Sequence, residues 1–439
     1  MKFFDREKEI AELRKNRELS SESSRFTVLT GRRRVGKTEL LHEAFSDRSY
    51  IYFYVSRKAL VDLCEDFRQI SEKMLGRTIP GDIRRFSQIF RFIMEESANR
   101  PLTLVIDEFQ DFLTVDETVF SEMARDWDEL HRKARINLVV SGSINRLMSR
   151  IFENREAPLY GRNTGRIKLA PFGIIVLKRI LSYYNPSWTN EDLLALWTFT
   201  GGVARYVALL MDAKAWTKKD MLREIIRENS SFFDEGKIVL IEEFGKEHGT
   251  YFSILSAIAG GRTSRDKIET VVGNAVGGYL TKLEREYDFI AKKQPIFETS
   301  ERKNCLYKID DNFYRFWFRF IFKYNYLLEV KMFKELRGIV ERDYDVFSGI
   351  ALEGYFAAKF VEERRYSRIG GWWNRKGEEE IDLVCENEFT NELAFYEVKR
   401  DRRRIDIGRL KDKAQAFFEK NPSKRERSQV FCGLSMEDM

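Results

Sequence analysis

The stretch that decides the fold of this chain is Phe26-Thr-Val-Leu-Thr-Gly31-Arg-Arg-Arg-Val-Gly36-Lys37-Thr38. It joins a short apolar run to a loop that contains two glycines, and residues 39–45 then continue with helical periodicity. The spacing satisfies GxxxxGK[ST], a pattern in which a loop between strand and helix wraps phosphate oxygens. The glycines let backbone N–H groups approach phosphate, and the start of the helix adds the positive end of its dipole. The sequence therefore predicts a phosphate-binding loop in an α/β domain.

Five short apolar runs alternate with helical segments in the first half of the chain. Strands built this way form a parallel sheet that helices bury on both faces. Asp5 is a suitable N-cap for a helix that extends to about Arg17. The fold class is therefore α/β, and the predicted strands are residues 26–30, 50–55, 102–106, 137–140 and 166–170.

The run Leu102–Ile106 ends in the acids Asp107 and Glu108. An acid at the carboxyl end of a strand lies at the edge of the sheet where phosphates bind. We expect Asp107 to hold Mg²⁺ directly or through water, and Glu108 to orient and deprotonate the attacking water.

The other residues expected at this site bind the nucleotide. Lys37 would contact the β- and γ-phosphates, and the Thr38 hydroxyl would ligate Mg²⁺. Ser141 and Ser143, after the strand at 137–140, would contact the γ-phosphate or the water, or form an ordinary turn. Arg162 or Arg166 would act as an arginine finger or sensor, or make a surface ion pair. The complete expected set for ATP is Gly31, Arg32, Arg33, Arg34, Val35, Gly36, Lys37, Thr38, Asp107, Ser141, Ser143 and Arg162.

Together these motifs resemble the archaeal-type ATPases of the AAA+/STAND class. Its landmarks correspond here to residues 4–9, 31–38, 106–108, 141–143, 158–162 and 201–203. The family usually has proline after the last of these, where this chain has Ala204. Over residues 1–345 the resemblance implies a RecA-like sheet, a helical lid, a winged helix and ATP-dependent switching.

Composition limits the class of protein. The chain has 439 residues with a net charge of +6, 3 His and 4 Cys. The cysteines are far apart and form no CxxC pair, so a metal should be a hard ion such as Mg²⁺ bound by oxygen. No apolar run approaches the roughly 18 residues of a membrane span, and the charged N-terminus is not a signal peptide. We therefore expect a cytoplasmic protein with no membrane partner.

Positive charge is concentrated near the C-terminus. Residues 400–428 hold 11 Lys and Arg against 5 acids. A basic patch attracts phosphate backbones, so duplex or branched DNA is an expected partner, bound mainly through Arg400, Arg402, Arg403 and Arg404. A solvated helix face is the alternative interpretation.

Residues 246–312 have the plan of a winged helix, with three helices and a two-stranded wing. Ala275–Tyr287 would be the recognition helix, with Lys282 and Arg285 facing outward. The wing would add the cations Lys292, Lys293, Arg302 and Lys303. The segment carries 11 basic and 10 acidic residues, which is weakly basic for a DNA-binding module. It is either a DNA contact or a packing and relay element.

The C-terminal residues predict a second site. Asp382 and Glu397 lie on neighbouring predicted strands, Lys399 shares a face with Glu397, and Glu353 lies on a preceding helix. Carboxylates of Glu353, Asp382 and Glu397 would hold Mg²⁺, and Lys399 would orient the nucleophile. The arrangement resembles the PD-(D/E)xK nuclease core, and also the uncharacterised domain often fused behind archaeal-type ATPases. The alternative is a charged sheet edge in an inactive module.

The expected domains are an ATPase core (1–180), a helical lid (181–245), a winged helix (246–312), a helical connector (313–345) and a nuclease-like domain (346–439). The function expected first is an ATP- and Mg²⁺-dependent ATPase that controls a DNA-engaging, nuclease-like domain, with Glu108, Lys37, Asp382, Glu397 and Lys399 as catalytic residues. The alternative is a STAND-type signalling switch that binds a protein partner. A homo-oligomer remains open.

Overall fold

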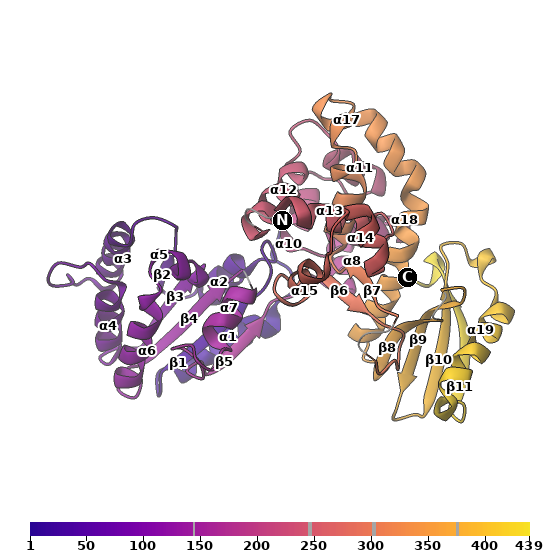
Figure 1. Ribbon diagram of the computed structural model, residues 1–439. Coiled ribbons are helices and arrows are strands. Elements are labelled where there is room, and N and C mark those ends of the chain that lie inside the picture. Colours follow the sequence, from indigo (N-terminus) through magenta and orange to yellow (C-terminus); the bar gives the residue numbers. More distant parts are fainter. Residues whose placement is uncertain (144, 245–247, 301–303, 375–376) are drawn as a thin grey trace. The chain divides into compact units, whose positions relative to one another are not determined.

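A computed structural model describes the chain except for residues 144, 245–247, 301–303 and 375–376 (Figure 1). The chain divides into two compact units. One unit is Asp5–Ala170, and the other comprises Met1–Phe4 and Pro171–Met439. The first unit therefore ends ten residues before position 180, the end that the sequence predicted for the ATPase core.

The unit 5–170 is built on a parallel sheet of five strands in the order β2-β3-β4-β1-β5. All five predicted strands form, within a few residues of the expected ends. Their bounds are β1 Arg25–Thr30, β2 Ile51–Tyr54, β3 Leu102–Asp107, β4 Ile136–Gly142 and β5 Gly165–Lys168. The β4 strand is buried along its whole length, as expected for a central strand covered on both faces.

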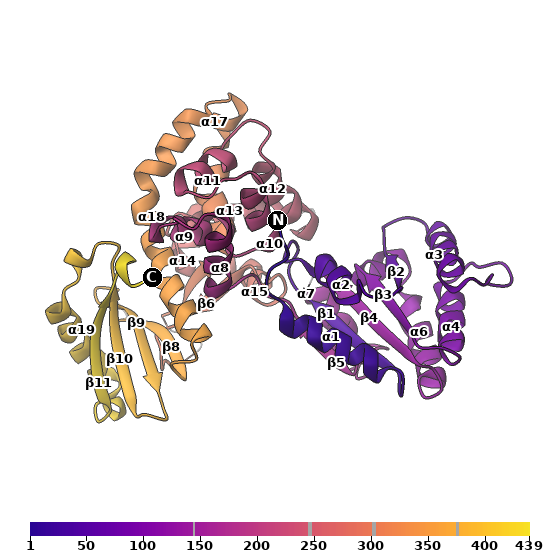
Figure 2. The same ribbon diagram turned by 180° about the vertical axis from the view of Figure 1, so that it is seen from behind.

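Helices surround this sheet (Figure 2). They are α1 Glu7–Leu19, α2 Lys37–Phe45, α3 Leu60–Leu75, α4 Phe86–Ser97, α5 Phe112–Val115, α6 Thr118–Leu130 and α7 Asn145–Phe152. Helix α1 packs against α2, β1 and β4, whereas α3 packs on β2 and α4, and α4 packs on α6.

Asp5 is not the N-cap of α1, which corrects the prediction. The helix begins at Glu7, and Arg6 occupies the N-cap position with φ 77° and no side-chain cap. Asp5 is also left-handed, with φ 62°. The buried Arg6 guanidinium donates to the Ala170 carbonyl at 2.6 Å, and this tertiary bond favours a conformation that a local capping rule does not predict.

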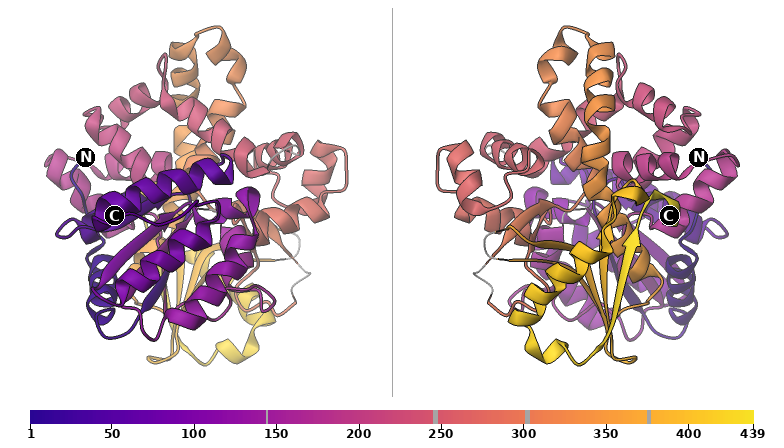
Figure 3. Two further views of the ribbon diagram at one scale, coloured as in Figure 1. Left: turned by 90° about the vertical axis from the view of Figure 1, so that its left-hand side faces the viewer. Right: turned by 90° about the vertical axis from the view of Figure 1, so that its right-hand side faces the viewer.

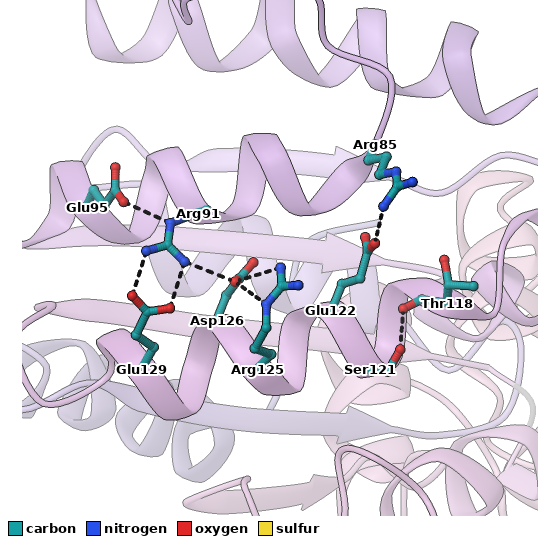
Figure 4. Close-up of polar contacts among 9 residues, drawn as sticks. All are labelled: Arg85, Arg91, Glu95, Thr118, Ser121, Glu122, Arg125, Asp126 and Glu129. Atoms are coloured by element: carbon teal, nitrogen blue, oxygen red, sulfur yellow. Dashed lines mark hydrogen bonds and ion pairs between the residues drawn. The ribbon is translucent and has the colours of Figure 1, made fainter.

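An ion-pair network joins α4 to α6 (Figure 4). Arg91 on α4 reaches three carboxylates, those of Glu95 at 3.0 Å, Asp126 at 3.4 Å and Glu129 at 2.7 Å. Asp126 is fully buried and also accepts from Arg125 at 3.0 Å. A buried carboxylate needs such partners because its desolvation is costly.

Replacing Arg91 with alanine should loosen this helix pair by about 1–2 kcal/mol, since buried Asp126 keeps only Arg125 as a partner. The amides of α4 and α6 should then exchange with deuterium roughly 5–30 times faster. Arg84→Ala is the matched control, because the one ion pair that Arg84 makes with a described residue is with exposed Asp82 at 2.6 Å. Equal exchange in the two variants would mean that the network does not stabilise the helix pair.

The unit that includes residues 171–439 begins with a helical array. Its helices are α8 Ile174–Tyr184, α9 Asn190–Thr200, α10 Ala204–Asp212, α11 Lys218–Ile225, α12 Ser231–Phe244, α13 His248–Ala259, α14 Arg265–Val272, α15 Gly277–Arg285, α16 Asn312–Phe316, α17 Asn325–Glu329 and α18 Phe333–Glu362. Helix α18 is continuous over 30 residues, so the predicted domain boundary between 345 and 346 falls inside it.

Two antiparallel strands, β6 Ile290–Lys293 and β7 Leu306–Ile309, form in the segment predicted to be a winged helix. The prediction extended the first strand over residues 289–297, whereas beyond β6 the Ile296 amide donates to the Gly371 carbonyl of the C-terminal sheet at 2.9 Å. Arg302 and Lys303, two of the predicted wing cations, lie outside the described residues.

The C-terminal sheet has four strands in the order β11-β10-β9-β8, with bounds β8 Arg368–Trp373, β9 Glu380–Asn387, β10 Glu392–Val398 and β11 Ser428–Leu434. Only the β10–β11 pair is parallel. Helix α19 (Ile407–Lys420) packs on β9, β10 and β11 (Figure 3). Along β10, Leu393 and Phe395 pack with α19, whereas Ala394 and Tyr396 belong to the core that includes α18. The sheet therefore lies between α18 and α19.

Candidate functional site

The loop between β1 and α2 has the backbone that the motif requires. Gly36 is the N-cap of α2 with φ 94°, and Arg34 has φ 71°. A Cβ on Gly31 would lie 2.6 Å from the Leu169 carbonyl oxygen, so this position has to be glycine. Lys37 is largely buried, and its Nζ donates to the carbonyls of Gly31 at 2.9 Å and Arg32 at 3.2 Å. The loop and its lysine therefore form one compact structure at the carboxyl end of β1.

The other expected loop residues differ in exposure. Val35 is buried, Arg32 and Arg33 are half-buried, and Arg34 is exposed. Buried Val35 anchors the loop to the domain, while the three arginines add positive charge at its rim.

Asp107 lies at the end of β3 and accepts four hydrogen bonds. Its Oδ2 accepts from Thr38 Oγ1 and from Tyr52 OH, each at 2.8 Å. Its Oδ1 accepts from Ser141 Oγ and, at 2.9 Å, from the Glu108 amide. Thr38 and Asp107 thus place a hydroxyl and a carboxylate oxygen close enough to bind one cation. Such hard oxygen donors suit Mg²⁺.

Tyr52 was not expected at this site. It lies on β2, next to β3 in the sheet, and only tertiary structure brings its hydroxyl to Asp107. Burial, with the Asp107 charge, raises the pKa of Tyr52, so the phenol remains a donor. No signal in the sequence identified it, because its place at the acid depends on β2 and β3 being neighbours in the sheet.

Glu108 follows Asp107 with a left-handed backbone, φ 52°. Its Oε2 accepts from Ser143 Oγ at 2.8 Å and from Gln110 Nε2 at 2.5 Å. In this structure Ser141 and Ser143 therefore donate to the two acids, and their contacts with phosphate or water stay a prediction. Gln110 is a second residue that the sequence analysis missed.

Arg162 and Arg166 lie away from this loop, and each makes an ion pair, which is the alternative that the sequence left open for them. Arg166 lies in β5, and Arg162 precedes that strand. Gly165, the first residue of β5, pairs with Thr27 near the start of β1, whereas the loop follows the end of β1. Arg162 pairs with Asp128 at 2.6 Å, and Arg166 with Glu153 at 2.7 Å. Because the strands are parallel, residues before a strand lie at the edge opposite the phosphate-binding loop.

In the C-terminal sheet, Asp382 and Glu397 converge on one ammonium group. Lys399 Nζ lies 3.1 Å from Asp382 Oδ2 and 3.7 Å from Glu397 Oε1. Asp382 Oδ2 also accepts from the Val398 amide at 2.7 Å. Burial opposes the charge of Lys399, but the two carboxylates outweigh it and raise its pKa. The structure thus brings together the three residues that the sequence predicted.

Glu353 lies near this cluster on α18. Burial, helped by the charge of Asp382, raises the pKa of Glu353 to about 8. A carboxyl that is protonated at neutral pH is a poor metal ligand. Within the described residues, no group of three or more His, Cys, Asp or Glu side chains is arranged to hold a metal ion. Two carboxylates are sufficient for Mg²⁺ when water or substrate phosphates complete its shell.

Six of the eleven Lys and Arg in the basic segment 400–428 are ion-paired, which reduces the expected DNA surface. Arg400 contacts Glu191 of α9 at 2.6 Å and Asp345 of α18 at 3.2 Å, and so is a structural residue. Two more of the four arginines expected to bind DNA have acidic partners, Asp438 for Arg402 at 3.1 Å and Asp401 for Arg403 at 2.8 Å. Lys424 and Arg427 pair with the buried Glu386. Five exposed cations of the segment form no ion pair with any described residue, namely Arg404, Arg409, Lys411, Lys420 and Arg425.

Cations of the predicted winged helix lie on α15 and β6. Lys282, Arg285 and Lys293 are exposed, and Lys292 is half-buried.

Comparison with known families accounts for most of the chain. Residues 3–210 match a family described as an ATPase domain predominantly from Archaea. Residues 317–410 match a family described as archaea bacterial proteins of unknown function. An uncharacterised protein of Methanocaldococcus jannaschii is 30% identical over 407 residues, covering 90% of this chain and 87% of that protein. The chain belongs to this family of archaeal-type ATPases.

Solved structures agree with this archaeal ATPase fold. A Walker-type ATPase of Pyrococcus abyssi matches with a TM-score of 0.54 at 19% identity, covering 72% of this chain and 96% of that one. The ORC2 protein of Aeropyrum pernix, in its ADPNP–ADP complexes, matches with a TM-score of 0.53 at 15% identity, covering 74% and 94%. At these identities the likeness concerns the fold alone.

These comparisons confirm the prediction of a P-loop ATPase with a parallel α/β sheet, and the family supports nucleotide use and ATP hydrolysis. The winged helix, the nuclease-like core and the roles of individual residues remain predictions. None of the helices in the described part of the chain is long and apolar enough to cross a membrane.

Proposed function

We propose that this archaeal-type ATPase hydrolyses ATP at the edge of the sheet formed by the loop 31–38, Asp107 and Glu108. The observation that carries the proposal is the 2.8 Å contact between Thr38 Oγ1 and Asp107 Oδ2, beside the loop and within one residue of Glu108. Phosphate-binding backbone, cation-binding oxygens and a general base are thus contributed by adjacent elements. Bound Mg²⁺ would neutralise charge on the β- and γ-phosphates.

Each residue of the site has a separate task. The backbone amides of 31–38 and the Lys37 ammonium bind the phosphates, because their donors and charge match phosphate oxygens. Thr38 and Asp107 hold the cation. Glu108 accepts a proton from the water that attacks the γ-phosphorus, which makes the oxygen a better nucleophile. The bond from the γ-phosphorus to the bridging oxygen breaks, and ADP and inorganic phosphate leave.

Thr38→Ala should increase the Mg²⁺ concentration needed for half-maximal ATP hydrolysis about tenfold, because one oxygen ligand is lost. A Mg²⁺ titration of steady-state ATPase activity measures this change. Thr118→Ala is the matched control, since the Thr118 hydroxyl also donates to an aspartate, Asp116 Oδ1 at 2.7 Å, away from the site. An unchanged Mg²⁺ requirement in Thr38→Ala would exclude Thr38 as a ligand.

We further propose that the nucleotide cycle controls the C-terminal domain, and that this domain cleaves DNA with Mg²⁺. Support comes from the convergence of Asp382 and Glu397 on Lys399. The neighbouring residue, Arg400, binds Glu191 on α9, in the segment expected to be the helical lid. A movement of α9 would therefore act directly on the residue that follows Lys399.

The second candidate is a switch that uses ATP to control binding of a protein partner. The specific observation in its favour is the ion pairing of Arg400, Arg402 and Arg403, three of the four arginines expected to contact a phosphate backbone. Tight binding of duplex or branched DNA that weakens steeply with salt would favour the nuclease-like function, because cations that neutralise phosphates release counterions. Absence of DNA binding at low salt would favour the switch.

A further inference from the structure

Gln110 is a buried polar residue with no role in the function described so far. It lies in the short helical turn Phe109–Asp111 after β3, and its side chain is 1% exposed. Its Nε2 donates to Glu108 Oε2 at 2.5 Å, whereas its Oε1 has no hydrogen-bond partner among the described residues. Burying an amide costs free energy unless its polar atoms are bonded. The bond to Glu108 is therefore the interaction that explains a glutamine at this position.

The neighbouring strand leaves room for this side chain. A Cβ on Gly142, at the end of β4, would lie 2.6 Å from Gln110 Oε1. Any larger residue at 142 would therefore displace Gln110 or force the strand to move. The turn that carries Gln110 and the end of β4 thus together define the space that the glutamine amide occupies.

The hydrogen bonds to Glu108 are asymmetric. Gln110 Nε2 and Ser143 Oγ both donate to Oε2, at 2.5 and 2.8 Å. Oε1 accepts no hydrogen bond from any described residue. The backbone of Glu108 is fixed separately, because its carbonyl accepts from the Asp111 amide at 2.9 Å. The two donors therefore set the orientation of the carboxylate and leave one oxygen for another partner.

We propose that Gln110 is a positioning residue for ATP hydrolysis, which holds Glu108 by Oε2 so that Oε1 accepts the proton of the attacking water. The proposal rests on the proposed role of Glu108 as general base. A base contributes most when its accepting atom is held in line with the proton it removes. Without Gln110, Ser143 alone would hold the carboxylate, and Glu108 would spend less time in the productive orientation.

Gln110→Leu keeps the size of the buried side chain and removes the donor. We expect kcat for ATP hydrolysis to fall about tenfold, while KM for ATP changes by less than about twofold, because Gln110 contacts the base and not the nucleotide. Gln69→Leu is the matched control, since Gln69 Nε2 also donates to a glutamate, Glu65 Oε1 at 2.7 Å, on the exposed face of α3. That control should hydrolyse ATP as the unmodified protein does.

A double-mutant cycle separates positioning from a structural role. If Gln110 acts through Glu108, adding Gln110→Leu to Glu108→Gln should lower kcat no further, whereas general damage to the fold would add to the loss. An additive loss, an unchanged kcat or an increase in kcat for Gln110→Leu would each overturn the proposal. If Glu108→Gln itself hydrolyses ATP normally, it is the proposed function of Glu108 that fails.

Discussion

Replacing Lys37 with alanine is expected to weaken ATP binding and to reduce hydrolysis by at least roughly 100-fold, the usual effect of removing a charged donor from a preorganised site. The Lys37 ammonium lies within the loop, on the carbonyls of Gly31 and Arg32, and is nearly buried. Alanine leaves the loop in place but removes the charge that faces the phosphates. Binding of a fluorescent ATP analogue and release of phosphate measure the two effects.

The matched control for this variant is Lys58→Ala. Lys58 belongs to the same unit and pairs with Asp66 on the surface, so its loss should leave ATP binding unchanged. Full ATP binding by Lys37→Ala would exclude the loop 31–38 as the nucleotide site.

Glu108→Gln should behave differently from Lys37→Ala. It keeps Asp107, Thr38 and the loop, so ATP should bind with normal affinity but be hydrolysed only at a low residual rate. The two variants together separate loss of binding from loss of chemistry. Equal hydrolysis by Glu108→Gln and the unmodified protein would remove Glu108 from the catalytic role.

The sequence pattern over short ranges was sufficient to predict the elements around the phosphate-binding loop. The strand, loop and helix around residues 26–45 form as the glycine spacing and hydrophobic periodicity predicted, and Asp107 ends β3 as expected. Each of these features depends on residues close together in sequence. The residues that the prediction missed, Tyr52 and Gln110, depend instead on which strands are neighbours and on how a turn packs, and short-range pattern does not contain that information.

The positions of two arginines have the same explanation. Arg162 was expected to act as an arginine finger or sensor or to make a surface ion pair, and the parallel order of β1 and β5 places it at the edge opposite the loop, where it pairs with Asp128. Arg400 was expected to contact DNA because it begins a basic run, but its partner Glu191 lies 209 residues earlier in the chain. A charge run indicates attraction to anions, yet the sequence does not reveal that the nearest anion is an internal carboxylate.

Replacing Asp382 with alanine is the variant with the largest expected effect on the C-terminal domain. If Asp382 and Glu397 hold a metal ion, nicking of DNA with Mg²⁺ or Mn²⁺ should fall by roughly 1000-fold, because the metal that activates water is lost. Nicking of a supercoiled plasmid, with EDTA as the blank, measures the activity. Nucleotide and DNA structure must both be varied, since the ATPase cycle is expected to control this domain.

Two further variants test how the site works. Lys399→Ala should slow nicking without preventing Mn²⁺ binding, because the ammonium is not a ligand. Glu388→Ala is the matched control, since Glu388 is exposed and pairs with Arg368 at 3.4 Å beyond the end of β9. It should nick DNA normally, and DNA binding and ATP hydrolysis should persist in all three variants.

A purely structural role for Asp382 predicts a different result. Its carboxylate accepts from the Val398 amide and from Lys399, so alanine would remove the side-chain acceptor of that amide and one partner of Lys399, and lower stability by about 1–2 kcal/mol. No combination of metal, nucleotide and DNA would then produce nicking by the unmodified protein. DNA binding without nicking would make the C-terminal domain a binding module, whereas absence of both would leave the ATPase as a switch for a protein partner.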